Sequence, residues 1–392
     1  MKWVKTEGKI VITGILMMLV MGSVYSYSVF RLPIENYYDV STSQSGIPYM
    51  LCLFFYAIFM GISGKLLQKT SMYKIMLIGI FFIVLGWLVA YLGKSFIILS
   101  IGYGVFIGIG VGMLYGIPLM VITKKFTKQK GLYLGLVLLG FGLSPFITAP
   151  IMQRLIEKVG LHQSFLIMGL FSFVILFSLS FFYKFSINIE DQFNKTKLKF
   201  LLKKKEYQLL YILFFIGTFI GLSVIGLSAT YAFKVLDINL EQAALFVSLF
   251  AVFNGLGRVV FGYLSDLLLF VDMMFLSYIS LATSTGLILI FSNNVIVFVI
   301  AFSVIWMNLG GWLALAPLAT ANLFGQAEYS RNYGVLFSAY GISALLGVYI
   351  SGILIDNFGG YQSSFIMFFL MSIFGVILTF VFNNKIKIIQ LK

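Results

Sequence analysis

The organisation of this chain is decided by one polar stretch, residues 184–208, which reads KFSINIEDQFNKTKLKFLLKKKEYQ. It is the only long polar interval between apolar runs, and it contains seven lysines. Six apolar runs precede it and six follow it. The stretch therefore predicts two halves joined by a basic linker: an N-terminal bundle at residues 1–183, the linker at 184–207 and a C-terminal bundle at 208–392.

Twelve apolar runs make up most of the chain. They fall near residues 10–32, 46–67, 73–93, 96–122, 131–153, 163–183, 208–233, 241–265, 273–292, 294–323, 332–355 and 361–383. About 20 apolar residues cross a bilayer as a helix. Of the 392 residues, 60% are hydrophobic and only 10% are charged, which excludes a soluble enzyme. We expect an all-α membrane protein with twelve transmembrane helices in two pseudo-symmetric six-helix bundles.

The basic residues are distributed unevenly between the two sides of the membrane. With the N-terminus in the cytoplasm, 21 of the 27 Lys and Arg residues fall in cytoplasmic tails and loops. The other side receives only Arg31, Lys94, Arg154, Lys158 and Lys234. This bias predicts a multi-pass protein of the cytoplasmic membrane with both termini cytoplasmic. It also explains the excess of positive charge by membrane topology and lipid contact, not by nucleic acid.

The sequence lacks the groups that most catalytic and cofactor sites need. The single cysteine, Cys52, lies in an apolar run and the single histidine, His162, lies in an external loop. There is no Cys/His spacing of a metal site, and the glycines lie within apolar helices where a dinucleotide loop does not occur. An embedded Ser/His pair or pair of acids is also missing. We therefore expect no metal, no cofactor and no enzymatic activity.

A short repeat relates the two halves. The second apolar run is followed by Gly64-Lys-Leu-Leu-Gln68-Lys69, and the eighth is followed by Gly262-Tyr-Leu-Ser-Asp266-Leu267. Each has a glycine with a polar residue four positions later, at a predicted cytoplasmic end. Equivalent positions in two six-span halves favour a duplicated transporter.

Arg258 is the residue that points most directly to function. It lies about midway through the eighth run, where an arginine must face protein or a water-filled cavity because its charge is costly in lipid. Asn254 lies one turn earlier on the same helix face. Gly255 and Gly257 leave room beside them for a neighbouring helix or a ligand.

No acidic residue is embedded in a run to neutralise Arg258, because all 13 Asp and Glu residues are expected in tails, loops or span ends. The counter-ion is therefore expected to arrive as the substrate, and a guanidinium binds a carboxylate with two parallel hydrogen bonds. A dedicated proton carrier is also missing. The pattern favours anion exchange, or entry of an anion whose own carboxylate carries the proton.

Aromatic residues and glycines complete the predicted site. Tyr25 in the first run, Tyr115 in the fourth and Tyr340 in the eleventh are candidates to orient the substrate or close the cavity. In the fifth run, Gly131 and Gly140 precede Pro145. Such glycines allow close helix contacts and prolines bend helices, which indicates either tight packing alone or an interface that moves during transport.

These motifs resemble those of the major facilitator superfamily. The stretch with Gly64 and Lys69 is similar to its loop 2–3 motif, and Gly262 and Asp266 keep the start of that motif in the second half. The Gly131, Gly140 and Pro145 spacing is similar to the fifth-span motif of its antiporters. The resemblance implies the major facilitator fold, alternating access, these seven residues as conformational motifs, and a monomer by analogy.

Within the superfamily, the chain most resembles the oxalate/formate antiporter branch, which is related to monocarboxylate transporters. The matching stretches include Gly22–Phe30, Gly140-Phe-Gly142, Asn254-Gly-Leu-Gly-Arg258 and Asn332-Tyr-Gly334. In oxalate transporters an eighth-span arginine and an eleventh-span lysine bind the two carboxylates. Arg258 matches the first, whereas Tyr340 stands at the second position.

With one embedded cation, a monoanion balances the site and a dianion leaves excess negative charge at low dielectric. The sequence therefore predicts a secondary transporter of a small monocarboxylate such as lactate, pyruvate or formate, with protons or a counter-anion as its coupling partner. An exporter of another small molecule, such as a drug, and a non-transporting membrane sensor of carboxylates are the alternatives.

Overall fold

The computed structural model of the chain describes residues 2–67, 70–126, 130–183, 202–324 and 329–390, and across these ranges it contains helices and no strand. The N-terminal half is built from α1 (Lys2–Met21), η1 (Gly22–Ser26), α2 (Ser28–Tyr38), α3 (Thr42–Ser45), α4 (Ile47–Leu66), α5 (Met72–Leu92), α6 (Phe96–Leu99), η2 (Ser100–Ile107), α7 (Gly108–Lys125), α8 (Lys130–Val159) and α9 (Leu161–Tyr183). The C-terminal half is built from α11 (Lys205–Leu236), α12 (Leu240–Leu267), α13 (Phe270–Ile290), α14 (Val295–Phe324), α15 (Tyr329–Asn357) and α16 (Tyr361–Gln390).

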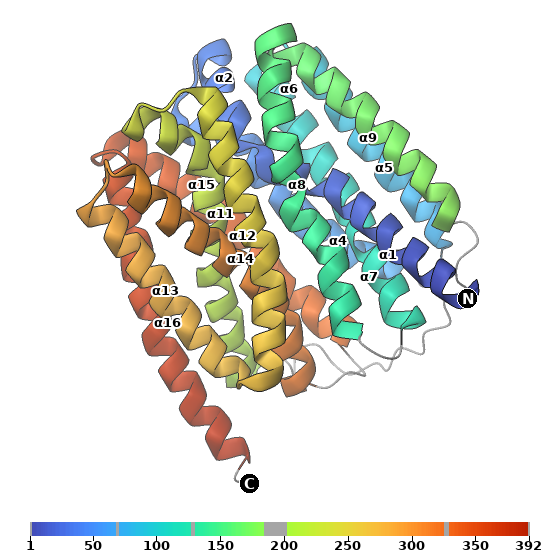
Figure 1. Cartoon of the computed structure of the whole chain (residues 1–392), viewed down its shortest axis with the longest axis vertical. Coiled ribbons are helices and arrows are strands. Elements are labelled where there is room, and N and C mark those ends of the chain that lie inside the picture. The colour runs from blue at the N-terminus through green and yellow to red at the C-terminus, as the bar shows by residue number, and fades with distance from the viewer. Residues whose placement is uncertain (1, 68–69, 127–129, 184–201, 325–328, 391–392) are drawn as a thin grey trace.

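Twelve helical stretches in the described part of the chain are long and apolar enough to cross a membrane. The predicted all-α membrane fold is confirmed. In Figure 1 the blue-to-green helices α1–α9 lie beside the yellow-to-red helices α11–α16. We call the side where α1 begins and α16 ends the termini side. The opposite side, which carries α2 and α3, is the far side (Figure 1).

The first span differs from its prediction. Arg31 and Pro33 were expected to end it near residue 32, but α2 continues through Pro33 to Tyr38. The helix then ends at Asp39, which has the left-handed backbone conformation (φ 52°) that asparagine and aspartate tolerate better than most residues. This extra length places Arg31 and Glu35 inside a helix, and both are buried.

The two halves meet along two pairs of helices, α8 with α12 and α4 with α15. Small residues make these contacts close. A Cβ built on Gly142 of α8 would lie 2.8 Å from Oδ1 of Asn254 on α12, and one built on Gly341 of α15 would lie 2.7 Å from Cβ of Ala57 on α4. In lipid, where apolar burial gives no drive for helix association, close backbone packing of this kind supplies the attraction.

Within the C-terminal half, α12 and α14 approach each other most closely. A Cβ built on Gly257 would lie 2.0 Å from the main-chain oxygen of Met307, and one built on Gly310 would lie 2.0 Å from that of Asn254. Glycine at both positions is therefore a requirement of the backbone geometry. The contact holds α12, and with it Arg258, at a fixed position against α14.

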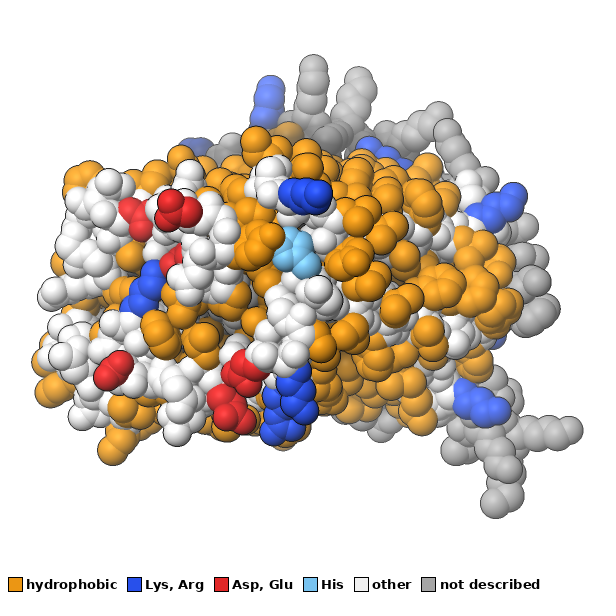
Figure 2. All heavy atoms as spheres, turned by 90° about the horizontal axis from the view of Figure 1, so that it is seen from above, with side chains coloured by type: hydrophobic (Ala, Val, Ile, Leu, Met, Phe, Trp, Pro, Cys, Tyr) orange, Lys and Arg blue, Asp and Glu red, His pale blue; other side chains and the backbone are white. Residues whose placement is uncertain are grey.

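The surface of the far side combines apolar and charged side chains. Figure 2 looks onto this side, where apolar side chains lie among polar groups, acidic and basic side chains lie at several places, and one histidine is visible. His162 lies there against Tyr38, with 3.1 Å between its Nε2 and the tyrosine hydroxyl.

Gly257→Ala is expected to destabilise the protein, because the added Cβ would force α12 away from α14 at a cost of about 1–3 kcal/mol. The measurement is the Tm of the purified protein in detergent, which should fall. The matched control is Gly135→Ala on α8, where a Cβ would meet no atom within 4 Å and helix propensity favours alanine. Equal Tm values for the two variants would contradict the close packing of α12 on α14.

Candidate functional site

Arg258 is a buried cation with almost no polar contact. Its residue is 2% exposed, and Nε and Nη1 have no hydrogen-bond partner among the described residues. Nη2 lies 3.5 Å from Oδ1 of Asn254, at the outer limit of a hydrogen bond. Leaving a buried charge unpaired costs several kcal/mol. The site therefore has positive charge and donor groups that an anion would satisfy.

Asn254 is positioned by α14. Its Nδ2 donates to the main-chain oxygen of Trp306 at 2.9 Å, and Nε1 of Trp306 in turn donates to Oγ of Ser228 on α11 at 3.1 Å. The amide oxygen of Asn254 is thereby turned toward Arg258. Because the asparagine is fully buried, these contacts fix its orientation and leave its oxygen able to accept from the guanidinium or from a bound molecule.

The N-terminal half reaches Arg258 through Phe141 of α8. The guanidinium carbon of Arg258 lies 5.7 Å from the centroid of this ring, a distance at which the face of an aromatic ring attracts a cation. Phe141 is flanked by Gly140 and Gly142, whose lack of side chains lets α8 approach α1 and α12. The arginine on one half is thus covered by an aromatic ring from the other.

Six aromatic rings from both halves form a connected cluster that reaches Arg258 through Phe141. Phe141 contacts the rings of Tyr25 (5.1 Å between centroids), Tyr56 (6.0 Å) and Tyr115 (5.4 Å). On α15, Phe337 and Tyr340 stack at 4.8 Å, and Tyr340 lies 5.7 Å from Tyr56. All six are buried. Their apolar faces exclude water, which strengthens any charge interaction made by Arg258.

A single hydrogen bond links the halves inside this cluster. The hydroxyl of Tyr25 in η1 lies 2.6 Å from the hydroxyl of Tyr340 on α15. Tyr25 is also close enough to Arg258 to interact with its charge. The pair therefore places two hydroxyl groups near the guanidinium, where one of them is available to a carboxylate if the pair separates.

The structure brings together the five residues predicted for substrate binding, Arg258, Asn254, Tyr25, Tyr115 and Tyr340, and adds three rings to them. The added residues are Tyr56, Phe141 and Phe337. The sequence contains signals for two of them. Phe141 lies between two glycines of the fifth-span motif, and Phe337 lies one turn before Tyr340.

The predicted conformational motif residues are more dispersed. Gly140 packs closely on α1, since a Cβ there would lie 2.5 Å from the oxygen of Ile15. The main-chain oxygen of Pro145 accepts a hydrogen bond from Ser248 on α12 at 3.3 Å, across the two halves. Gly64 and Gly262 lie near the ends of α4 and α12. A Cβ built on either would meet no atom within 4 Å.

Three predicted motif positions are only partly described or not described. Gly131 lies in the first turn of α8 and Asp266 in the last turn of α12, and Lys69 lies outside the described residues. Their part in conformational change stays a prediction. Among the described residues, no three His, Cys, Asp or Glu side chains lie together as metal ligands would.

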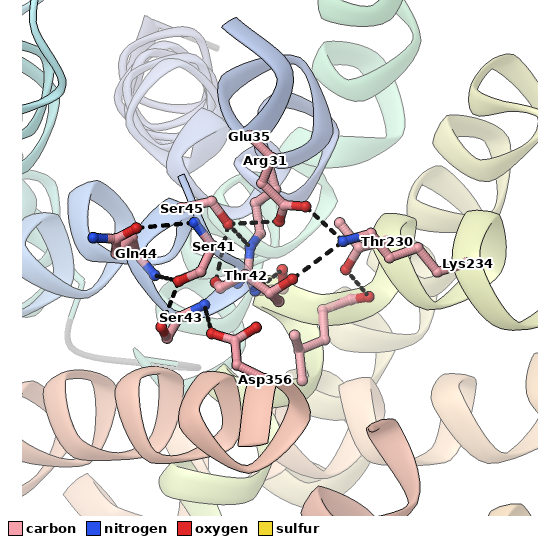
Figure 3. A network of polar contacts seen from close by, with 12 residues as sticks. Arg31, Glu35, Ser41, Thr42, Ser43, Gln44, Ser45, Thr230, Lys234 and Asp356 are labelled. Carbon is pink, nitrogen blue, oxygen red and sulfur yellow. Dashed lines mark hydrogen bonds and ion pairs between the residues drawn. The ribbon is translucent and has the colours of Figure 1, made fainter. Parts of the chain in front are cut away.

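The structure contains a second cluster of charged side chains, Arg31, Glu35 and Lys234, which the sequence did not predict. Arg31 and Lys234 were expected in external loops and Glu35 in a loop or at a span end, but Arg31 and Glu35 are buried in α2, and Glu35 pairs with Lys234 of α11 (Figure 3). The expectation failed because apolar runs alone do not show where a helix continues past a charged residue. These three residues lie on the far side in α2 and α11, whereas Arg258 lies within α12.

Twelve spans in two halves, with an unpaired cation between them, are the architecture of a membrane transporter, not of an enzyme. A family model described as "Major Facilitator Superfamily" matches residues 12–320. The chain belongs to this superfamily and is a multi-pass membrane transporter.

Relatives agree with this assignment at low identity. The chain is 25% identical to an uncharacterised MFS-type transporter, YhjX, of Escherichia coli (strain K12), with 87% of this chain and 86% of that protein covered. It is 24% identical to the oxalate:formate antiporter of Oxalobacter formigenes, with 89% and 85% covered. It is 26% identical to monocarboxylate transporter 12 of Xenopus laevis, with 73% and 68% covered.

Solved structures show the same fold. A bacterial homologue of the human lysosomal transporter Spinster, in an inward-facing and unoccupied conformation, superimposes with a TM-score of 0.75 at 12% identity, and 97% of each chain is covered. At this identity the likeness shows the fold alone.

Tyr25→Phe is expected to lower the stability of the ligand-free protein by about 1 kcal/mol, because the buried hydroxyl of Tyr340 loses its partner. The measurement is Tm in detergent without substrate. Tyr103→Phe is the matched control, since it removes the same atom from a fully buried ring whose hydroxyl has no partner in the described ranges. A fall in Tm as large for Tyr103→Phe as for Tyr25→Phe would refute the role of the inter-half hydrogen bond.

Proposed function

We propose that this transporter carries a small organic monocarboxylate, of the lactate, pyruvate or formate type, by alternating access between its two halves. The observation that supports this most directly is the buried guanidinium of Arg258, two of whose nitrogens have no partner among the described residues. A carboxylate offers two acceptor oxygens in the planar geometry that a guanidinium binds. It would also neutralise the charge that the empty site leaves uncompensated.

The charge balance supports a monoanion. Arg258 is a single cation, and Tyr340 stands where the oxalate transporters have a lysine. The hydroxyl of Tyr340 is engaged with Tyr25, so this position supplies a hydrogen bond and no charge. A dianion would bring one uncompensated negative charge into a water-poor site, which costs several kcal/mol. The apolar ring faces suit the short carbon chain of the same acid.

Two relatives support the same class of substrate. The names of the oxalate:formate antiporter of Oxalobacter formigenes and of monocarboxylate transporter 12 of Xenopus laevis both refer to carboxylates. Coverage extends over most of this chain in both. Because identity is about a quarter, the carboxylate class transfers better than the particular acid.

Coupling follows from the same charge balance. No carboxylate of the described residues contacts Arg258, which supports a coupling that does not use an acidic side chain of the site as proton carrier. Exchange of one monoanion for another, or entry of an anion together with a proton, satisfies the arginine in both directions. We infer a location in the cytoplasmic membrane with both termini in the cytoplasm, in accord with the distribution of basic residues, and a monomer by analogy with other members of the superfamily.

Arg258→Gln is expected to reduce uptake of labelled lactate or formate into proteoliposomes by about 100-fold or more, because removing one partner of a buried charge pair costs at least 2–3 kcal/mol. Oxalate is expected to compete weakly with the wild-type protein. Arg154→Gln, which removes an exposed arginine at the far-side end of α8, is the control and should transport normally. An imposed proton gradient or internal counter-anion then separates co-transport from exchange.

Normal uptake by Arg258→Gln would overturn the site assignment. Absence of carboxylate uptake by the wild-type protein, with transport of an unrelated compound, would favour an exporter of another cargo. Carboxylate binding in detergent without flux in liposomes would identify a sensor.

A further inference from the structure

A network of polar groups joins the two halves on the far side. It consists of Arg31, Glu35, Thr42 and Ser45 from α2 and α3, and Lys234 of α11, and we call it the far-side network (Figure 3). Arg31 and Ser45 are fully buried, and Thr42 and Glu35 are 6% and 9% exposed. The side chain of Lys234 is 33% exposed. The network therefore lies at the edge of the interface, partly within reach of water.

Three contacts of the network cross from one half to the other. Nζ of Lys234 lies 2.6 Å from Oε2 of Glu35 and 3.1 Å from Oγ1 of Thr42. Nη1 of Arg31 donates to the main-chain oxygen of Gly226 in α11 at 3.0 Å. These contacts require α2 and α3 to lie against α11, so they exist only while the far side is closed.

The remaining contacts stay within the N-terminal half. Nε of Arg31 donates to Oγ of Ser45 at 3.1 Å, and that hydroxyl donates to Oε1 of Glu35 at 2.8 Å. Nη2 of Arg31 donates to the main-chain oxygen of Thr42. Arg31 and Glu35 also lie four residues apart on α2, which places them on one helix face where opposite charges pair directly. The two will therefore remain together when the halves separate.

A further contact closes the same side at α15. The main-chain nitrogen of Ser43 donates to Oδ2 of Asp356 at 2.8 Å, and a Cβ built on Gly46 would lie 2.8 Å from Val348 of α15. Val348 is 1% exposed. Separation of the halves on this side would uncover it.

We propose that the far-side network is a latch that holds this side of the transporter closed and releases by exchange of ion-pair partners. When the halves separate, Glu35 loses Lys234 and pairs with Arg31, which has lost the Gly226 oxygen. The acid is thus paired in both states, whereas Lys234 is paired only in the closed one. On opening, Lys234 becomes an unpaired cation at the mouth. The latch does not depend on which substrate the transporter carries.

The test measures access to Val348 without any substrate. In a protein lacking its one cysteine (Cys52→Ala), the change Val348→Cys introduces a buried thiol, and the rate of its reaction with a polar maleimide in detergent reports opening of the far side. Lys234→Met is expected to raise this rate about fivefold, since an ion pair at the edge of a protein contributes on the order of 1 kcal/mol. Lys234→Arg, which keeps the charge, should leave the rate within about twofold.

Glu35→Gln distinguishes partner exchange from a simple lock. Because Glu35 is paired in both states, its removal weakens both, and its effect on the labelling rate should be smaller than that of Lys234→Met. The matched control is Lys158→Met, which removes an exposed lysine from the far-side end of α8 and should leave the rate unchanged. Tm values of all variants exclude general unfolding as the cause of faster labelling.

An unchanged rate for Lys234→Met, or an equal increase for Lys158→Met, would overturn the latch. An effect of Glu35→Gln as large as that of Lys234→Met would overturn the exchange of partners. Failure of carboxylate uptake in the transport assay leaves all of these outcomes unaffected, because the labelling assay contains no substrate.

Discussion

The structure depends on one constraint, the cost of a charged group where water is scarce. Arg258 and Arg31 are both buried cations, yet they are treated differently. Arg31 donates to two main-chain oxygens and a hydroxyl, so its charge is solvated by the protein. Among the described residues, the guanidinium of Arg258 has a single long hydrogen bond, to Oδ1 of Asn254. A buried arginine with satisfied donors is held by the protein itself, whereas one with unsatisfied donors is a candidate to bind an anion.

Glycines determine how closely the helices around Arg258 approach one another. Gly257 and Gly310 let α12 and α14 approach at backbone distance, and Gly142 lets α8 approach Asn254. Side chains at these positions would separate the helices that position Arg258 and Phe141. The same approach brings a ring from the N-terminal half onto the cation of the C-terminal half, so a ligand of Arg258 would contact both halves at once. A molecule bound between two halves is able to influence how they move.

Two polar contacts join the halves at different depths. Tyr25 and Tyr340 join the halves at the centre, and the ion pair of Lys234 with Glu35 joins them at the far side. Each contact involves only a few atoms, and water or an anion could take the place of either partner. Polar contacts of this kind can exchange their partners for water or an anion, which packed apolar side chains cannot do.

Much of this protein was determined by its sequence alone. The length and spacing of the apolar runs predicted twelve helices, because a backbone in lipid must pair internally and runs of about 20 residues fit helices. The position of Arg258 within a run predicted a buried cation. The sequence did not predict that the ring of Phe141 faces this arginine, that Phe337 stacks on Tyr340, or that Arg31 and Glu35 lie in a helix paired with Lys234. The contacts of Phe141 with Arg258 and of Glu35 with Lys234 join residues far apart in the chain. Only the tertiary structure decided them, because hydropathy records how deep a residue lies, whereas partners are set by which helices pack together.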